Sequence, residues 1–144
     1  MTLPDLKQLE AIVKPAAAEI LVPGFGKHSY SYKADGSIIT AADEAMQQRL
    51  EEELARTWPD YAFLGEEMSE AEQRAAMTNA AGYWCIDPLD GTNNYATGMP
   101  FFAVSIALII NKVQTLGLVY DPLRDEVFTA VKGEGALFNG ESLK

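Results

Sequence analysis

Apolar residues recur at helical spacing near the start of the chain. Residues 4–20 carry them every three or four positions, although Pro15 is expected to kink or split the helix that this pattern predicts. A second helix is predicted over residues 41–57, because Thr40 fits an N-cap and Asp43 stands at the reciprocal capping-box position. The other face of this helix is rich in glutamate, which indicates a solvated surface. The sequence therefore predicts two long helices in its first 57 residues.

Most of the remaining chain has the pattern of β-strands. Residues 29–39 alternate loosely around an Asp-Gly pair, which is typical of a hairpin. Residues 61–64 predict a short strand, and a polar, alanine-rich helix is predicted over 69–78. Turn residues then separate further predicted strands, at 83–86, 103–110, 113–120, 126–131 and 136–138. Two helices followed by a mainly antiparallel sheet predict an α+β fold.

The acidic balance of the chain narrows its possible partners. Across 144 residues, 11 Lys and Arg stand against 21 Asp and Glu, which gives a net charge of −10. This charge argues against nucleic acid or an anionic membrane as the main partner, and it is compatible with cation binding. The length fits a single domain, over residues 1–144, that buries a core without help from a disulfide or a metal.

Cysteine usage and hydropathy indicate the cellular compartment in which the protein is expected. Cys85 is the only cysteine, so no internal disulfide can form, and its apolar neighbours in sequence predict an inert core thiol. No apolar run reaches the roughly 18 residues that a membrane span requires. The N-terminus lacks the basic and apolar regions of a signal peptide. We therefore expect a cytoplasmic protein.

Acidic residues stand where predicted strands end. Glu66 and Glu67 follow one strand, Asp87 ends the next, and Asp90 comes after a proline turn. Each of these acids could be separately exposed or cap a turn. If the strand ends meet, however, four carboxylates would repel one another and lose hydration unless cations neutralise them. Oxygen ligands suit Mg²⁺, and the lack of His or Cys partners argues against zinc.

The segment after Asp90 has the features of an anion-binding site. Gly91 has no Cβ and allows the backbone to approach a ligand closely. If a helical turn starts near Thr92, its free N–H groups point at an anion in front of them. Cations beside an anion site are what the hydrolysis of a phosphate ester needs.

Several stretches of the sequence together form a recognisable set: Gly65-Glu66-Glu67, Trp84 to Thr92, Pro100 to Ile106, Lys33 with Thr40 to Asp43, Leu116 to Pro122 and Lys132 to Ala136. These stretches closely resemble the inositol monophosphatase family. That family belongs to a lithium-sensitive, magnesium-dependent phosphatase superfamily, which includes fructose-1,6-bisphosphatases and nucleotide-3′-phosphatases. The resemblance covers nearly all of the chain and implies the N-terminal half of the sugar-phosphatase fold, with two long helices packed on a mainly antiparallel sheet.

The resemblance implies a set of metal ligands. Glu66, Asp87 and the backbone carbonyl of Leu89 would hold a first Mg²⁺. Asp87 would bridge to a second ion that Asp90 also binds. Glu66 and Glu67 would orient water or bind a third, weaker ion, and we count Glu67 among the catalytic residues. Mn²⁺ is expected to substitute for Mg²⁺, and Li⁺ to inhibit.

The resemblance also implies the catalytic groups. Thr92, hydrogen-bonded to Asp43, would help to deprotonate the metal-bound water, which attacks phosphorus in line with the leaving group. Backbone N–H groups of Gly91 and Thr92 would hold the phosphate. Lys33 would pair with the carboxylates or lie on a flexible loop near the site, while a plain surface lysine remains the alternative. The implied function is hydrolysis of inositol monophosphate or a related sugar phosphate, with fructose 1,6-bisphosphate and nucleotide 3′-phosphates as alternative substrates.

The sequence departs from the family in its length. Family members continue for about as many residues again, and their second half carries a Trp-Asp-x-Ala-Ala-Gly segment that completes the second metal site. Here only Trp58 and Trp84 are present, and neither precedes an aspartate. We consider three hypotheses: an N-terminal part of a phosphatase that lacks the C-terminal domain, a short protein completed by a partner, and a non-catalytic metal- or phosphate-binding module. The first is favoured, and an exposed sheet edge or apolar face would then promote homodimers or other self-association.

Overall fold

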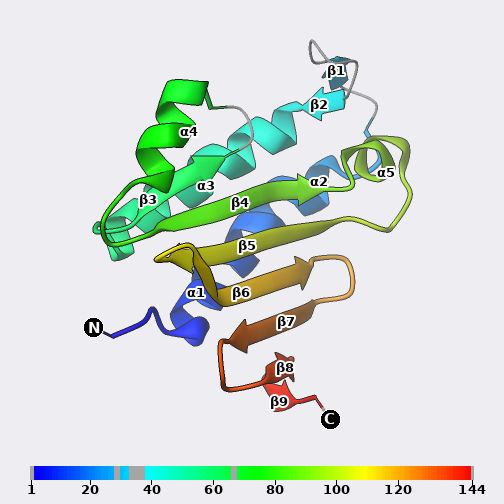
Figure 1. Cartoon of the computed structure of the whole chain (residues 1–144). Coiled ribbons are helices and arrows are strands. Elements are labelled where there is room, and N and C mark those ends of the chain that lie inside the picture. Colours follow the sequence, from blue (N-terminus) through cyan, green and yellow to red (C-terminus); the bar gives the residue numbers. More distant parts are fainter. Residues whose placement is uncertain (1, 28–29, 33–37, 66–67, 144) are drawn as a thin grey trace.

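The computed structural model describes residues 2–27, 30–32, 38–65 and 68–143, and it confirms the α+β fold. Within these residues the chain forms two sheets and a layer of helices (Figure 1). The helical segments are α1 (Leu6–Ala16), the π-helix η1 (Ala17–Leu21), α2 (Val22–Gly24), α3 (Ala41–Thr57), α4 (Glu70–Met77) and α5 (Thr92–Thr97). The strands are β1 (Tyr30–Tyr32), β2 (Ile38–Thr40), β3 (Ala62–Gly65), β4 (Tyr83–Asp90), β5 (Ala103–Ile110), β6 (Val113–Asp121), β7 (Glu126–Val131), β8 (Ala136–Phe138) and β9 (Glu141–Ser142).

The main sheet is a meander with one parallel pair. Among the described residues its seven strands follow one another in sequence order, from β3 to β9. β3 and β4 run parallel and are joined through α4, whereas every later neighbour is antiparallel. β1 and β2 pair separately in an antiparallel hairpin, as predicted. The predicted bounds of β5, β7 and β8 agree with the structure, and β9 was not predicted.

One face of the main sheet packs against the N-terminal helices. In Figure 1 helices α1, α2 and α3 all lie behind the sheet. Alternate residues of the strands, among them Trp84, Ile106 and Leu118, are buried on that side and form one core with Leu9 and Leu50 of the helices. Each large side chain buried in this way contributes about 1.5–3 kcal/mol, so this single interface supplies most of the hydrophobic stabilisation.

The first helix changes type after its proline. Pro15 has no N–H to donate, and two residues later the chain widens into η1, in which the N–H of Val22 donates to the carbonyl of Ala17. The helical path continues through α2 as far as Gly24, although none of the residues of α2 is buried. The expected interruption is therefore confirmed as a π-helical segment.

Tyr95 joins this segment to α5. Its hydroxyl donates a 2.6 Å hydrogen bond to the carbonyl of Leu21, the last residue of η1. The ring is 2% exposed and packs edge-on against Phe102, with 5.0 Å between ring centroids. Burial, together with the negative charge of Asp43, raises the pKa of Tyr95 to about 12, so the phenol stays protonated and donates throughout the neutral range.

The predicted strand at 83–86 is too short. β4 continues through Pro88 to Asp90, and its pairing with β5 shifts register between Asp87 and Asp90. The shift resembles a β-bulge, which is one of the few places where a sheet tolerates a proline that lacks its N–H group. Asp87 therefore lies within a strand rather than at its end.

The opposite face of the sheet is covered much less, and we call it the open face. It is formed by the strand residues that alternate with the buried ones, and it includes Cys85, Val119 and Phe128. The prediction that Cys85 is a core thiol is wrong, because its side chain is exposed. Its apolar neighbours in sequence are buried on the helix side, whereas Cys85 points the other way. None of the helices in the described residues is both long and apolar enough to cross a bilayer.

The Tyr95 hydrogen bond gives a first prediction. Substituting Tyr95→Phe should lower the free energy of unfolding by about 1–3 kcal/mol, because the buried carbonyl of Leu21 loses its partner. Urea denaturation followed by circular dichroism measures the change. Tyr83→Phe is the matched control, since the hydroxyl of half-buried Tyr83 has no hydrogen bond among the described residues. Equal stability of the two variants would contradict this role of Tyr95.

Candidate active site

Asp43 is the centre of a hydrogen-bond network between two parts of the chain. The backbone N–H of Thr40 donates to Asp43 Oδ2 at 2.9 Å, and the Thr40 hydroxyl donates to the same oxygen at 2.6 Å. The N–H of Asp43 donates back to Thr40 Oγ1 at 3.3 Å, which completes the predicted capping box of α3. Thr40 is 5% exposed, so this cap is largely shielded from water.

The second carboxylate oxygen of Asp43 faces Thr92. The Thr92 hydroxyl lies 3.1 Å from Asp43 Oδ1 and 3.1 Å from the carbonyl oxygen of Leu89. A hydroxyl has a single proton, so it donates to only one of these acceptors at a time. The capping box fixes the Asp43 carboxylate and thereby the position at which Thr92 finds an acceptor.

Asp87 and Asp90 lie on either side of the register shift in β4. The half-buried Asp87 accepts a hydrogen bond from the N–H of Leu89 through Oδ1, at 3.2 Å, and the side chain of Asp90 is exposed. The Leu89 side chain is 2% exposed and belongs to the core. Burial of Leu89 therefore anchors the segment that carries both carboxylates and the Leu89 carbonyl.

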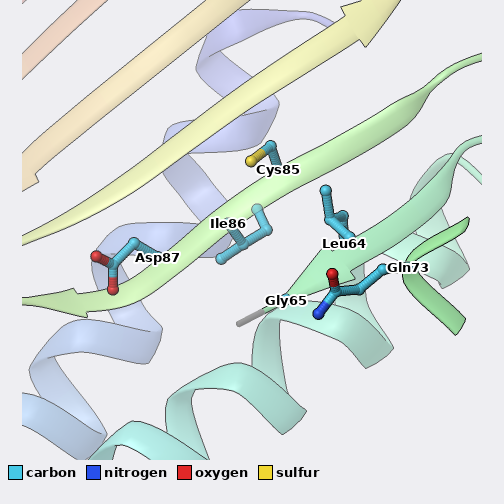
Figure 2. A pocket seen from close by; sticks show the side chains of 6 residues that line it. All are labelled: Leu64, Gly65, Gln73, Cys85, Ile86 and Asp87. Atoms are coloured by element: carbon cyan, nitrogen blue, oxygen red, sulfur yellow. The ribbon is translucent and has the colours of Figure 1, made fainter. Parts of the chain in front are cut away.

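A pocket of about 370 Å³ opens beside Asp87. Figure 2 shows Asp87 and Cys85 on β4, with Gln73 coming from α4. The other residues that line it are Leu64, Gly65 and Ile86. Because β3 is parallel to β4 and Gly65 pairs with Ile86, the last residue of β3 lies next to the strand position that precedes Asp87.

The structure brings together part of the predicted site. It joins Asp43, Thr92 and the Leu89 carbonyl, and it places Asp87 and Asp90 on the same strand segment. The predicted residues Lys33, Glu66 and Glu67 lie outside the described residues. Within the described part of the chain, no group of three or more His, Cys, Asp or Glu side chains could hold a metal ion. The chemistry of the donors nevertheless fits a hard cation, because Asp87, Asp90 and the Leu89 carbonyl all offer oxygen atoms.

Gly91 has a structural requirement of its own. Its φ is +94°, and a Cβ at this position would lie 2.8 Å from the carbonyl oxygen of Phe101. The loop that approaches it is held by Asn94, whose side-chain amide donates to that same carbonyl at 2.8 Å. Sequence reasoning assigned no chemistry to Asn94, and this contact shows that it shapes the turn after the site.

The single thiol lies close to the candidate metal ligands. Partial burial, and then the negative charge of Asp87, raise the pKa of the Cys85 thiol above its usual value. The thiol is therefore largely protonated and weakly nucleophilic at neutral pH. Cys85 is therefore exposed, but we expect it to react more slowly at neutral pH than a thiol of ordinary pKa.

The comparisons with known proteins agree with the fold. Residues 4–144 match the profile described as "Inositol monophosphatase family". The chain is 39% identical over 129 residues to inositol monophosphatase 3 of Solanum lycopersicum, and the match covers 89% of this chain and 48% of that protein.

Solved structures show the same similarity. An inositol monophosphatase structure from Thermotoga maritima superposes with a TM-score of 0.84 at 29% identity, covering 96% of this chain and 52% of that one. A structure described as an inositol monophosphatase and NADP phosphatase, complexed with NADP and Ca²⁺, superposes with a TM-score of 0.77 at 26% identity, covering 99% and 55% of the two chains. The chain thus spans about half the length of the relatives that it matches.

The crowding around Gly91 leads to a second prediction. Gly91→Ala should lower the free energy of unfolding by roughly 1–3 kcal/mol more than Gly133→Ala does, and urea denaturation compares them. Both glycines have positive φ, at +94° and +83°, but a Cβ at position 133 meets nothing within 4 Å. The difference between the two variants isolates the clash with the Phe101 carbonyl. Equal losses of stability would argue against that clash.

The Cys85 thiol gives a third prediction. Its rate of reaction with a disulfide reagent should keep rising with pH beyond about 9.5, where a thiol with the ordinary pKa of about 8.5 is already mostly ionised and its rate levels off. Asp87→Asn should increase the rate at pH 8 by roughly two- to threefold, because it removes a charge that disfavours the thiolate. Asp60→Asn, an exposed site on another segment, serves as control. A rate that Asp87→Asn leaves unchanged would contradict the electrostatic contribution.

Proposed function

The chain belongs to the inositol monophosphatase family, and from this premise we propose that it serves the magnesium-dependent hydrolysis of inositol monophosphate or a related sugar phosphate. The observation that carries the proposal is the hydrogen bond from Thr92 to Asp43, formed next to the Leu89 carbonyl. It joins residues 49 positions apart in sequence into the arrangement that the family resemblance implies. Because the chain spans about half of its relatives, the activity of the whole protein is part of the proposal.

The metal ligands are those that the family resemblance implies, and all of them are oxygen donors. Glu66, Asp87 and the Leu89 carbonyl would hold a first Mg²⁺, Asp87 and Asp90 would hold a second ion, and Glu67 would assist. When bound, the ion supplies Lewis-acid chemistry: it lowers the pKa of water and neutralises the charge of the phosphate. The relative solved with Ca²⁺ supports a hard divalent cation in this family. Inhibition by Li⁺ and substitution by Mn²⁺ belong to the same proposal.

Thr92 and Asp43 would accept the proton that the attacking water loses. A threonine hydroxyl is too weak a base to act alone, but it can pass a proton toward a carboxylate that is already hydrogen-bonded to it. If the Leu89 carbonyl binds a cation, it no longer accepts a hydrogen bond from Thr92. Asp43 is then the remaining acceptor in this network for the hydroxyl proton of Thr92. With that proton donated to Asp43, the lone pairs of the Thr92 oxygen would be free to accept a proton from water, and the capping box keeps Asp43 in place.

The phosphate would be held by the backbone N–H groups of Gly91 and Thr92, as the family resemblance implies. The backbone at Gly91 has the positive φ that this turn requires, and glycine adopts such a φ without strain. Fructose 1,6-bisphosphate and nucleotide 3′-phosphates remain alternative substrates within the superfamily. A cytoplasmic location is proposed as well, because a lone unpaired cysteine suits a reducing compartment.

A second candidate function is a module that binds a metal or a phosphate without turning substrate over. The oxygen donors of Asp87, Asp90 and the Leu89 carbonyl would serve such a module as well as they would serve a hydrolase. We propose that the chain corresponds to the N-terminal half of the family fold, and the experiment below separates binding from turnover.

A fourth prediction tests the proposal. Purified chain should bind Mn²⁺ in a calorimetric titration, and Asp87→Asn should weaken binding at least about tenfold, because it removes a charged ligand. Asp60→Asn, an equally conservative change of an exposed aspartate, should leave binding unchanged. If the chain hydrolyses inositol 1-phosphate with Mg²⁺, Thr92→Val should lower kcat by roughly 100-fold or more, whereas Thr92→Ser retains most of it.

The outcomes are distinct. Metal binding with turnover supports the hydrolase, and binding that depends on Asp87 without turnover supports the non-catalytic module. Absence of any metal binding that Asp87→Asn weakens would count against both.

A further inference from the structure

A second pocket lies along one side of α4. Its volume is about 570 Å³, against about 370 Å³ for the pocket beside Asp87, and small-molecule sites usually have about 300–1,000 Å³. Tyr83 at the start of β4 and Lys112 in the turn between β5 and β6 line it from outside the helix. The lining residues from α4 and its C-cap are Glu70, Gln73, Arg74, Met77 and Thr78. Gln73, which Figure 2 labels, lines both pockets, so the two adjoin.

Part of this pocket is apolar. Met77 is 55% exposed, and among the large hydrophobic residues that the structure describes only Phe101, at 58%, is more exposed. The half-buried side chain of Tyr83 lines the same pocket. A methionine is flexible and polarizable, so together with an aromatic ring it offers an adaptable surface for a flat apolar group. This part of the pocket therefore suits a ligand with a planar apolar body.

Two positive charges reach the pocket from segments that are far apart in the sequence. Arg74 comes from α4 and Lys112 from the β5–β6 turn. Neither side chain has an ion pair within the described residues, whereas Arg49 and Arg124 both bind carboxylates. The hydroxyl of Tyr83 likewise has no hydrogen bond in the described part of the chain. In a chain with a net charge of −10, two cations left without a carboxylate partner favour an anion between them.

The other polar groups around the pocket leave room for that anion. Glu70 is the only acidic residue among those that line it, and it forms no ion pair with Arg74 one turn later. Backbone carbonyls at the end of a helix repel an anion when they are free. Here the Arg74 carbonyl accepts from the N–H and the hydroxyl of Thr78, and the Ala76 carbonyl accepts from the N–H of Asn79. These contacts reduce the repulsion at this end of α4.

We propose that this pocket binds a small organic anion, with a carboxylate, sulfonate or phosphate group carried on a planar apolar body. The anionic group would lie between Arg74 and Lys112, and the body would lie against Met77 and Tyr83. The proposal goes beyond the hydrolase function and does not depend on it, because none of these residues has been assigned a part in the reaction. Charge and apolar contact each contribute to binding, and each can be removed separately.

Isotope-labelled methionine methyl groups observe the pocket directly. Naphthalene-2-sulfonate, used as the probe, should shift the methyl resonance of Met77 with a dissociation constant below about 1 mM, because the bound ring changes the magnetic environment of that methyl group. Met77→Leu assigns the signal. Met99 is 50% exposed in the segment between α5 and β5, and its resonance is the internal control that should not move.

Two matched ligands separate the contributions. Naphthalene-2-methanol has the ring without the charge, and methanesulfonate has the charge without the ring. Each should bind at least about tenfold more weakly than the probe, because each lacks one of the two contacts. An uncharged ligand that binds as tightly as the probe would show a plain apolar patch and overturn the proposal.

Charge variants test the residues themselves. Arg74→Gln with Lys112→Gln should raise the dissociation constant of the probe at least about tenfold, each single variant should raise it about threefold, and Glu70→Gln should lower it about twofold. Arg56→Gln, at the exposed end of α3, removes an equal charge outside the pocket and should leave binding unchanged. The single variants keep the test valid if the double variant fails to fold.

Three further results would overturn the proposal. The first is a Met77 resonance that does not move at probe concentrations up to about 5 mM, since a built site for this ligand class should be largely occupied there. The second is a shift of Met99 equal to that of Met77, which would indicate unspecific adsorption. The third is binding that the charge variants leave unchanged in folded protein.

Discussion

Three hydrogen bonds converge on the carboxylate of Asp43, and the rest of the site depends on them. Two come from Thr40, at the start of α3, and the third comes from Thr92, at the start of α5. The first pair is a local device that begins a helix, and the third connects that helix to the segment that carries Asp87 and Asp90. One side chain thus both caps a helix and positions a functional hydroxyl, so its geometry is fixed by the stability of the fold.

Local patterns in the sequence were sufficient for features that depend on near neighbours. The capping box of Thr40 and Asp43 spans three residues, and its chemistry is visible in the sequence itself. The strands at 103–110 and 126–131 were predicted with their observed bounds, because turn residues flank both of them. Features that depend on contacts between residues far apart in the sequence could not be predicted from local patterns. The extension of β4 through Pro88 depends on Asp90 pairing with Ala103, and the exposure of Cys85 depends on which sheet face the helices cover.

The candidate site was predicted partly from chemistry and partly from resemblance. Asp87 and Asp90 were predicted as cation ligands because they are carboxylates near strand ends. The hydrogen bond between Thr92 and Asp43, by contrast, was expected from the family resemblance alone. No local pattern could indicate that Tyr95 would reach Leu21 or that Asn94 would hold the Phe101 carbonyl. The roles of Lys33, Glu66 and Glu67 stay predictions, since these residues lie outside the described part of the chain.

The meander of the main sheet has a consequence for the order of folding. From β4 to β9 each strand pairs with its neighbour in sequence, so the loops that must close are short and cost little entropy. The hydrogen bonds that complete the site close far longer loops, because Asp43 and Thr92 are 49 positions apart in sequence and Leu21 and Tyr95 are 74 apart. We therefore expect the strands to assemble early and the N-terminal helices to dock late. Release of those helices would break the hydrogen bond between Asp43 and Thr92 and so dismantle the site, which means that an intact site reports whether the whole chain has folded.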